Sequence, residues 1–81
     1  MNKQKQIVPK WFNGEIYDKG GIVVNPLSNQ KCELNNIELS MYDFIMGSLM
    51  INHNDKHSDD LKKGLTWFVD NNAEAYMILL D

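Results

Sequence analysis

The 81-residue chain contains no arginine, only one cysteine and no long apolar run, and each scarcity excludes a class of protein. A single cysteine, Cys32, cannot form a disulfide within the chain, which excludes a small secreted fold held together by disulfides. The most apolar stretch, residues 37–51, is interrupted by four polar or charged residues and therefore lacks the pattern of a membrane-spanning helix. Residues 1–6 are mostly polar and lack the apolar segment of a signal peptide. We expect a soluble, cytoplasmic protein without membrane contacts.

Acidic residues outnumber basic ones, eleven to eight, which gives a net charge of −3. The charge is unevenly spread, because Lys3, Lys5 and Lys10 precede the first acidic residue of the chain. We expect residues 1–10 to form a flexible tail and residues 11–81 to form a single domain. A domain that binds duplex nucleic acid usually presents a clustered basic face, whereas residues 11–81 are acidic overall. Nucleic acid is therefore disfavoured as a partner.

Two or three short β-strands are predicted in the first half of the chain. Residues 11–17 are rich in aromatic and β-branched residues, and residues 22–24 are all β-branched. Residues 31–34 alternate polar and apolar side chains, which places Cys32 inward as a small, unreactive apolar residue. Turn-forming glycine, asparagine and proline residues separate the three segments. The pattern predicts a small antiparallel β-meander.

A long central helix is predicted after the strands. Asn35 and Glu38 have the spacing of a capping box, in which each side chain caps the other residue's backbone, and the helix is expected to end near Asn52. One narrow wedge of the helix is polar and contains Asn36, Ser40, Asp43 and Gly47. One apolar flank is expected to lie on the sheet: Ile37, Met41, Phe44, Ile45 and Ile51. The other is expected to be covered in part by a second subunit in a homodimer: Leu39, Tyr42, Met46, Leu49 and Met50.

Two shorter helices are predicted to follow. Ser58 is a favourable N-cap for an amphipathic helix that ends near Asn71. Asn72 can cap a third helix, although residues 73–80 could alternatively form a strand. The predicted fold class is α+β, with a β-meander of two or three strands followed by two or three helices, the first of them central.

His53 and His57 are four residues apart and could form a metal site together with Cys32 and with Asp55 or Asp59. We favour solvated loop histidines, because the surrounding residues are typical of a loop rather than a helix. Calcium is not expected either, since Asp55, Asp59 and Asp60 lack the spacing of a calcium-binding loop. We predict no metal ligands and no cofactor.

Three further groups of residues could serve catalysis, phosphate binding or the binding of nucleic acid. Ser40 and Asp43 could form a catalytic pair, but solvent-facing helix residues give the same pattern. Residues 20–21 are glycines followed by a strand, whereas a phosphate-binding loop is followed by a helix. An aromatic group on the predicted sheet could stack on bases: Trp11, Phe12 and Tyr17. The absence of arginine argues against that use, and we expect no enzymatic activity and no catalytic residues.

Five short stretches of the chain form a recognisable set: Pro9-Lys10-Trp11-Phe12, Asn25-Pro26-Leu27-Ser28, Cys32-Glu33-Leu34-Asn35, residues 38–47, and Glu74-Ala75-Tyr76-Met77. Together they resemble small uncharacterised proteins encoded by tailed bacteriophages of marine cyanobacteria. The abundance of asparagine, isoleucine and lysine, with no arginine, is typical of an A+T-rich genome. The resemblance implies an auxiliary protein that is made in the cytoplasm of an infected bacterium, and it implies no particular activity.

Three functions remain open from the sequence. The leading one is a small non-enzymatic protein that acts through protein–protein contacts, as a phage auxiliary or host-interaction protein that forms a homodimer. The first alternative is a nucleic-acid-associated factor that uses the sheet aromatics and the N-terminal lysines. The second alternative is a metal-binding protein that uses His53, His57 and Cys32.

Overall fold

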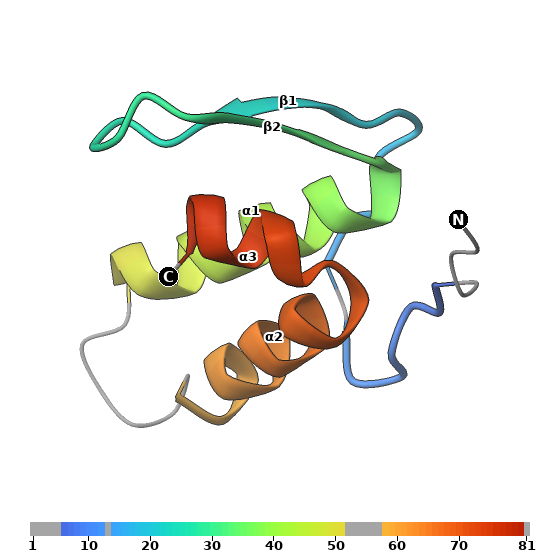
Figure 1. Cartoon of the computed structure of the whole chain (residues 1–81). Coiled ribbons are helices and arrows are strands. Elements are labelled where there is room, and N and C mark those ends of the chain that lie inside the picture. Colours follow the sequence, from blue (N-terminus) through green and yellow to red (C-terminus); the bar gives the residue numbers. More distant parts are fainter. Residues whose placement is uncertain (1–5, 13, 52–57, 81) are drawn as a thin grey trace.

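The structure, a computed structural model, describes residues 6–12, 14–51 and 58–80 of the chain. Its elements are strands β1 (Gly21–Val24) and β2 (Lys31–Leu34), followed by helices α1 (Asn36–Ile51), α2 (Ser58–Asn71) and α3 (Ala73–Leu79). Figure 1 shows the two strands as a layer over α1 and α3, with α2 on the far side of these helices. The predicted α+β class, with the first helix central, is confirmed.

The sheet is a two-stranded antiparallel hairpin in which Val23 lies opposite Cys32. Its turn is stabilised by Asn25. The side-chain oxygen of Asn25 accepts from the backbone N–H of Leu27 at 2.9 Å, and the backbone N–H of Asn25 donates to the Gln30 carbonyl at 2.8 Å. Asn29 occupies the left-handed region with φ of 64°, which asparagine tolerates better than most residues. The hairpin spans residues 21–34 and consists of the second and third of the three predicted strands.

The predicted strand over residues 11–17 is wrong, because the described residues in that range do not pair with the sheet. Phe12 is buried against the side of α1, with its ring centroid 5.3 Å from that of Phe44. Trp11 lies next to both rings, 6.2 Å from Phe12 and 5.8 Å from Phe44. Aromatic residues have high strand propensity, but here packing between rings decides the conformation.

The start of α1 confirms the predicted capping box. The backbone N–H of Glu38 donates to the Asn35 side chain at 2.8 Å, and the backbone N–H of Asn35 donates to the Glu38 carboxyl at 2.9 Å. The helix then runs to Ile51, close to the predicted end. Two backbone donors that a helix start leaves unpaired are thus satisfied by the local sequence.

The polar wedge of α1 differs from the prediction, because the segment before β1 covers part of it. Ser40 is buried, and its hydroxyl accepts from the Tyr17 backbone N–H at 2.9 Å while donating to the Asn36 carbonyl at 2.7 Å. The Tyr17 hydroxyl donates to the exposed Asp43 carboxyl, and this hydrogen bond raises the pKa of Tyr17. Tyr17 therefore lies along the helix rather than in a strand.

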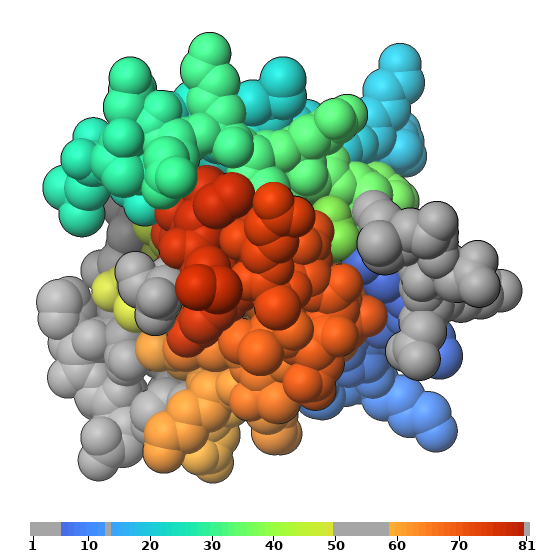
Figure 2. All heavy atoms as spheres, in the orientation of Figure 1, coloured from blue at the N-terminus to red at the C-terminus, as the bar shows by residue number. Residues whose placement is uncertain are grey.

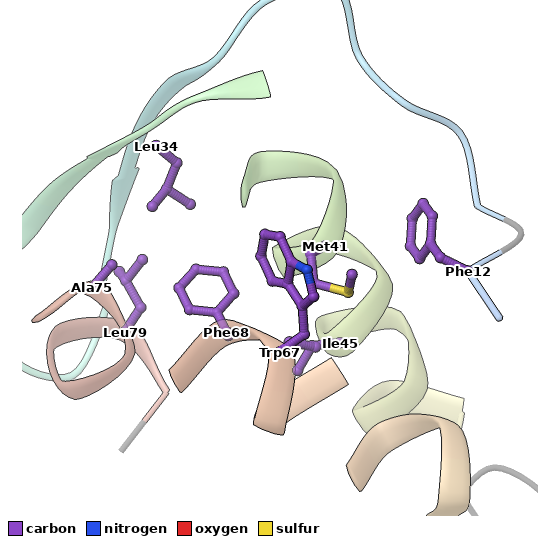
Figure 3. Packing of buried hydrophobic residues seen from close by; sticks show 8 residues of the cluster. All are labelled: Phe12, Leu34, Met41, Ile45, Trp67, Phe68, Ala75 and Leu79. Carbon is purple, nitrogen blue, oxygen red and sulfur yellow. The ribbon is translucent and has the colours of Figure 1, made fainter. Parts of the chain in front are cut away.

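The hydrophobic core lies between α1, α2, α3 and the inner face of the hairpin. Its eight members are Phe12, Leu34, Met41, Ile45, Trp67, Phe68, Ala75 and Leu79. Figure 3 shows Phe68 near the middle of this group, with α3 side chains on one side and Met41 on the other. The close approach of α2 to α1 depends on Gly64, where a Cβ atom would lie 3.0 Å from Ile45.

Helix α1 packs more extensively on α2 than on the sheet, so the expected packing of one flank on the sheet is only partly correct. In the flank assigned to a second subunit, Leu39 and Tyr42 pack against the core and are half-buried. Leu49 is 51% exposed, whereas the side chain of Met50 is outside the described part of the structure. Much of that flank is therefore covered within one chain.

The last two helices confirm the predicted boundaries. Helix α2 runs from Ser58 to Asn71, and Asn72 caps α3 by accepting from the Ala75 backbone N–H at 3.1 Å. Residues 73–79 are thus helical, and the alternative of a strand is wrong. Among the described residues, no helix combines the length and apolar character needed to cross a bilayer.

The N-terminal segment makes specific contacts from residue 6 onward, while residues 1–5 of the expected tail are outside the described residues. The Gln6 side chain donates to the Glu38 carboxyl at 2.7 Å and accepts from the Asn35 side chain at 2.9 Å. The Trp67 indole N–H donates to the Ile7 carbonyl at 3.1 Å. Packing of the described chain therefore begins before residue 11, the predicted start of the domain.

Candidate binding groove

A surface groove of about 410 Å³ lies between the N-terminal segment and the outer face of α2. It is lined by Pro9, Trp11, Lys62, Lys63, Thr66, Trp67 and Asp70. In Figure 2 the N-terminal segment, in blue, lies directly against the surface of α2, in orange. We refer to these seven residues as the tryptophan–lysine groove.

The lining residues of α2 share one face of the helix. Their positions, 62, 63, 66, 67 and 70, follow the spacing of about 3.6 residues per turn that brings side chains to the same side. Trp67 is 9% exposed and is held at the base of the groove by its hydrogen bond to the Ile7 carbonyl. The opposite wall is held by Trp11, whose ring packs on Phe12 and Phe44. Both indole rings are thus held by contacts within the chain.

The charge of the groove differs from that of the chain. Lys62 and Lys63 are exposed on its rim, and Asp70 is the single acidic residue among the seven that line it. The whole chain has a net charge of −3. The groove therefore combines an apolar aromatic floor with a locally positive rim, which suits an apolar group next to a negative one.

The base-stacking prediction for Trp11, Phe12 and Tyr17 is wrong in its geometry. Neither strand contains an aromatic residue, and the three side chains do not form one exposed surface. Phe12 is buried in the core, and Tyr17 is hydrogen-bonded along α1. Of the three, only Trp11 lines the groove, and the other aromatic residue that lines it is Trp67.

The candidate metal site falls mostly outside the described residues, because His53, Asp55 and His57 are all in the range 52–57. In the ranges 6–12, 14–51 and 58–80, no three histidine, cysteine, aspartate or glutamate side chains are grouped so that they could hold a metal ion. Cys32 lies on β2, and Asp59 is in the first turn of α2. The positions of Cys32 and Asp59, the two candidate ligands among the described residues, thus give no support to a metal site.

The remaining candidates have structural roles. Ser40 and Asp43 each form a hydrogen bond to Tyr17 and thereby anchor the segment before β1 to α1. A Cβ atom at Gly20 would lie 1.9 Å from the Leu34 carbonyl oxygen, so a glycine is needed there for close approach of the two chain segments.

Cys32 is half-buried on the inner face of the hairpin, and its thiol is predicted to react slowly. Burial raises the pKa of Cys32, and the nearby carboxyl groups of Glu74, Glu38 and Glu33 raise it further. Since the thiolate is the reactive form, labelling by a maleimide at pH 7 should be slower in the native protein than in urea, and should accelerate as the pH rises. Equal rates in the two conditions would show that the side chain is freely accessible.

The groove was missed by sequence reasoning because its residues come from two segments about fifty positions apart. On α2, Lys62, Lys63 and Trp67 have the pattern of any amphipathic helix, and only the tertiary fold places Trp11 beside them. A weak signal was available in the two tryptophans of the chain, each close to a lysine.

Comparisons of the chain with protein-family models, curated proteins and solved structures found no match.

Proposed function

We propose that this protein is a non-enzymatic binding protein whose tryptophan–lysine groove takes a short acidic segment of another protein, with an apolar side chain in the groove. The observation that carries the proposal is the pairing of two fixed indole rings with two lysines at the rim of one groove. Grooves lined by aromatic residues commonly bind extended peptides, and rigid aromatic residues lose little conformational entropy on binding. A phage auxiliary or host-interaction role, as implied by the sequence resemblance, is compatible with such an activity.

An acidic peptide fits the groove better than a nucleic acid does. Two exposed lysines, with Asp70 on the same groove, can pair with one or two carboxylates, whereas a polynucleotide presents a phosphate at every step. Only Trp11 offers a partly exposed ring, because Trp67 is 9% exposed and engaged by Ile7. Sequence-tolerant binding of single strands generally uses several stacking rings along a basic channel.

Both tryptophans of the chain line the groove, so intrinsic tryptophan fluorescence reports directly on its occupancy. The probe is a hexapeptide of four aspartates around a central phenylalanine–proline pair, titrated into the full chain. We expect a saturable change in emission that weakens as salt is added, because the rim contacts are exposed ion pairs. The same peptide with lysines in place of aspartates should give no saturable change.

The variant Lys62→Glu, combined with Lys63→Glu, should weaken the binding of the acidic peptide by about ten-fold or more. Lys19→Glu is the matched control, because Lys19 is exposed and lies outside the groove. Unchanged affinity in the double variant would overturn the proposal. Saturable binding of a thymidine oligonucleotide, lost in the double variant, with no binding of the peptide would replace it with the nucleic-acid alternative.

A further inference from the structure

We infer that the outer face of the β-hairpin is a self-association surface, on which a second copy of the chain packs face to face about a two-fold axis. The outer face consists of Ile22 and Val24 on β1 and Lys31 and Glu33 on β2. Ile22 is 68% exposed and Val24 is 41% exposed, in a strand that has no charged residue. This surface is separate from the tryptophan–lysine groove, so the inference does not depend on the proposed function.

The alternation of side chains along the strands defines this face. Val23, Cys32 and Leu34 point to the inner face and pack on or into the core. Their neighbours therefore point outward, and the burial of the two strands alternates accordingly. In the register of the hairpin, Ile22 lies opposite Glu33 and Val24 lies opposite Lys31. The outer face is thus a square of four side chains, apolar along one strand and oppositely charged along the other.

This arrangement is complementary to itself. Consider two hairpins stacked face to face, with a two-fold axis that lies in the plane between them and runs perpendicular to the strands. This axis reverses the direction of the strands in the second copy and places its β1 over the β1 of the first. It places Ile22 of each copy over Val24 of the other, and Glu33 of each copy over Lys31 of the other. The contact between Ile22 and Val24 and the ion pair between Glu33 and Lys31 therefore each form twice, as an isologous interface requires. A two-fold axis parallel to the strands would instead place apolar side chains over charges.

The occupant of this face is a second copy rather than a partner of one charge. The two charges on the face are of opposite sign and sit on the same strand, so the surface gives no net attraction to an acidic or a basic protein. The square is much smaller than a standard interface of about 20–30 residues a side, so the dimer should be weak and dependent on concentration. The alternative site for dimerisation is the flank of α1 that contains Leu49, which the sequence pattern assigned to a second subunit.

Sedimentation velocity over a range of protein concentrations tests the inference with three charge variants. Glu33→Lys alone, or Lys31→Glu alone, places like charges opposite one another and should weaken dimerisation by about ten-fold. An equimolar mixture of the two single variants should form a mixed dimer, because one copy then has two lysines and the other two glutamates. Combining both changes in one chain should restore the wild-type affinity.

Glu15→Lys is the matched control, because Glu15 is exposed and lies outside the hairpin. It should leave dimerisation unchanged, and far-ultraviolet circular dichroism checks that each variant is folded. A wild-type chain that stays monomeric up to about 1 mM would overturn the inference. A dimer that survives Glu33→Lys but is lost in Leu49→Asp would also overturn it, because the interface would then be on α1.

Discussion

Phe68→Ala should lower the free energy of unfolding by about 3–5 kcal/mol, the largest loss expected from any single truncation in this core. Phe68 is 0% exposed, and its ring contacts Trp67 in an edge-to-face arrangement at 6.1 Å. Its removal leaves a cavity between α1, α2 and α3 that the surrounding backbone can fill only partly. A small domain has roughly 5–15 kcal/mol of stability in total, so a substantial fraction of this variant should be unfolded at 37 °C.

Urea denaturation followed by circular dichroism measures this loss. Val69→Ala is the matched control, since Val69 is the next residue of the same helix and is 39% exposed. The Val69→Ala substitution removes less apolar surface from a partly solvated position, and it should lower the free energy of unfolding by about 1 kcal/mol or less. Similar losses in the two variants would indicate that Phe68 does not occupy the centre of the core.

Glu38→Ala should lower the free energy of unfolding by about 3 kcal/mol or more, although Glu38 is a charged residue on a helix. Glu38 is 3% exposed, and its carboxyl group accepts hydrogen bonds from the Asn35 backbone, from Gln6 at 2.7 Å and from Asn72 at 3.1 Å. Truncation leaves these donors without their acceptor, at about 1–3 kcal/mol for each one that remains buried. Each donor belongs to a different part of the chain.

Thermal and urea unfolding of Glu38→Ala should be compared with those of Glu15→Ala, in which an exposed glutamate is removed. The control should change the free energy of unfolding by about 0.5 kcal/mol or less. The stability of Glu38→Gln should lie between those of the two alanine variants. Its side-chain amide retains one acceptor oxygen, but its NH2 group faces a donor where the second carboxyl oxygen accepted a hydrogen bond. Equal stability of Glu38→Ala and Glu15→Ala would mean that the carboxyl group is solvated.

Local signals in the sequence predicted the helices well. The reciprocal pattern of Asn35 and Glu38, and the capping residue Asn72, each satisfy backbone groups within three or four positions. Such contacts depend on neighbouring residues alone, so the sequence contains all the information needed. The β-branched run at residues 22–24 gave β1 correctly for the same reason.

Features that depend on distant residues were not predictable in this way. Residues 11–17 have strand propensity, but the rings of Trp11 and Phe12 pack on Phe44, thirty-two or more positions away. Glu38 was recognised as a local cap, whereas its bonds to Gln6 and Asn72 bridge 32 and 34 positions. The groove belongs to this second group, because one wall comes from the N-terminal segment and the other from α2.

The docking of the N-terminal segment has a thermodynamic consequence for the groove. Pro9 and Trp11 form one wall, and the hydrogen bond between Trp67 and the Ile7 carbonyl joins that wall to α2. A ligand that contacts both walls binds only molecules in which the segment is docked, so its apparent dissociation constant equals the intrinsic one divided by the docked fraction. By linkage, the same ligand raises that fraction. Substitutions at Gln6, outside the groove, can therefore change affinity by shifting a population rather than by removing a contact.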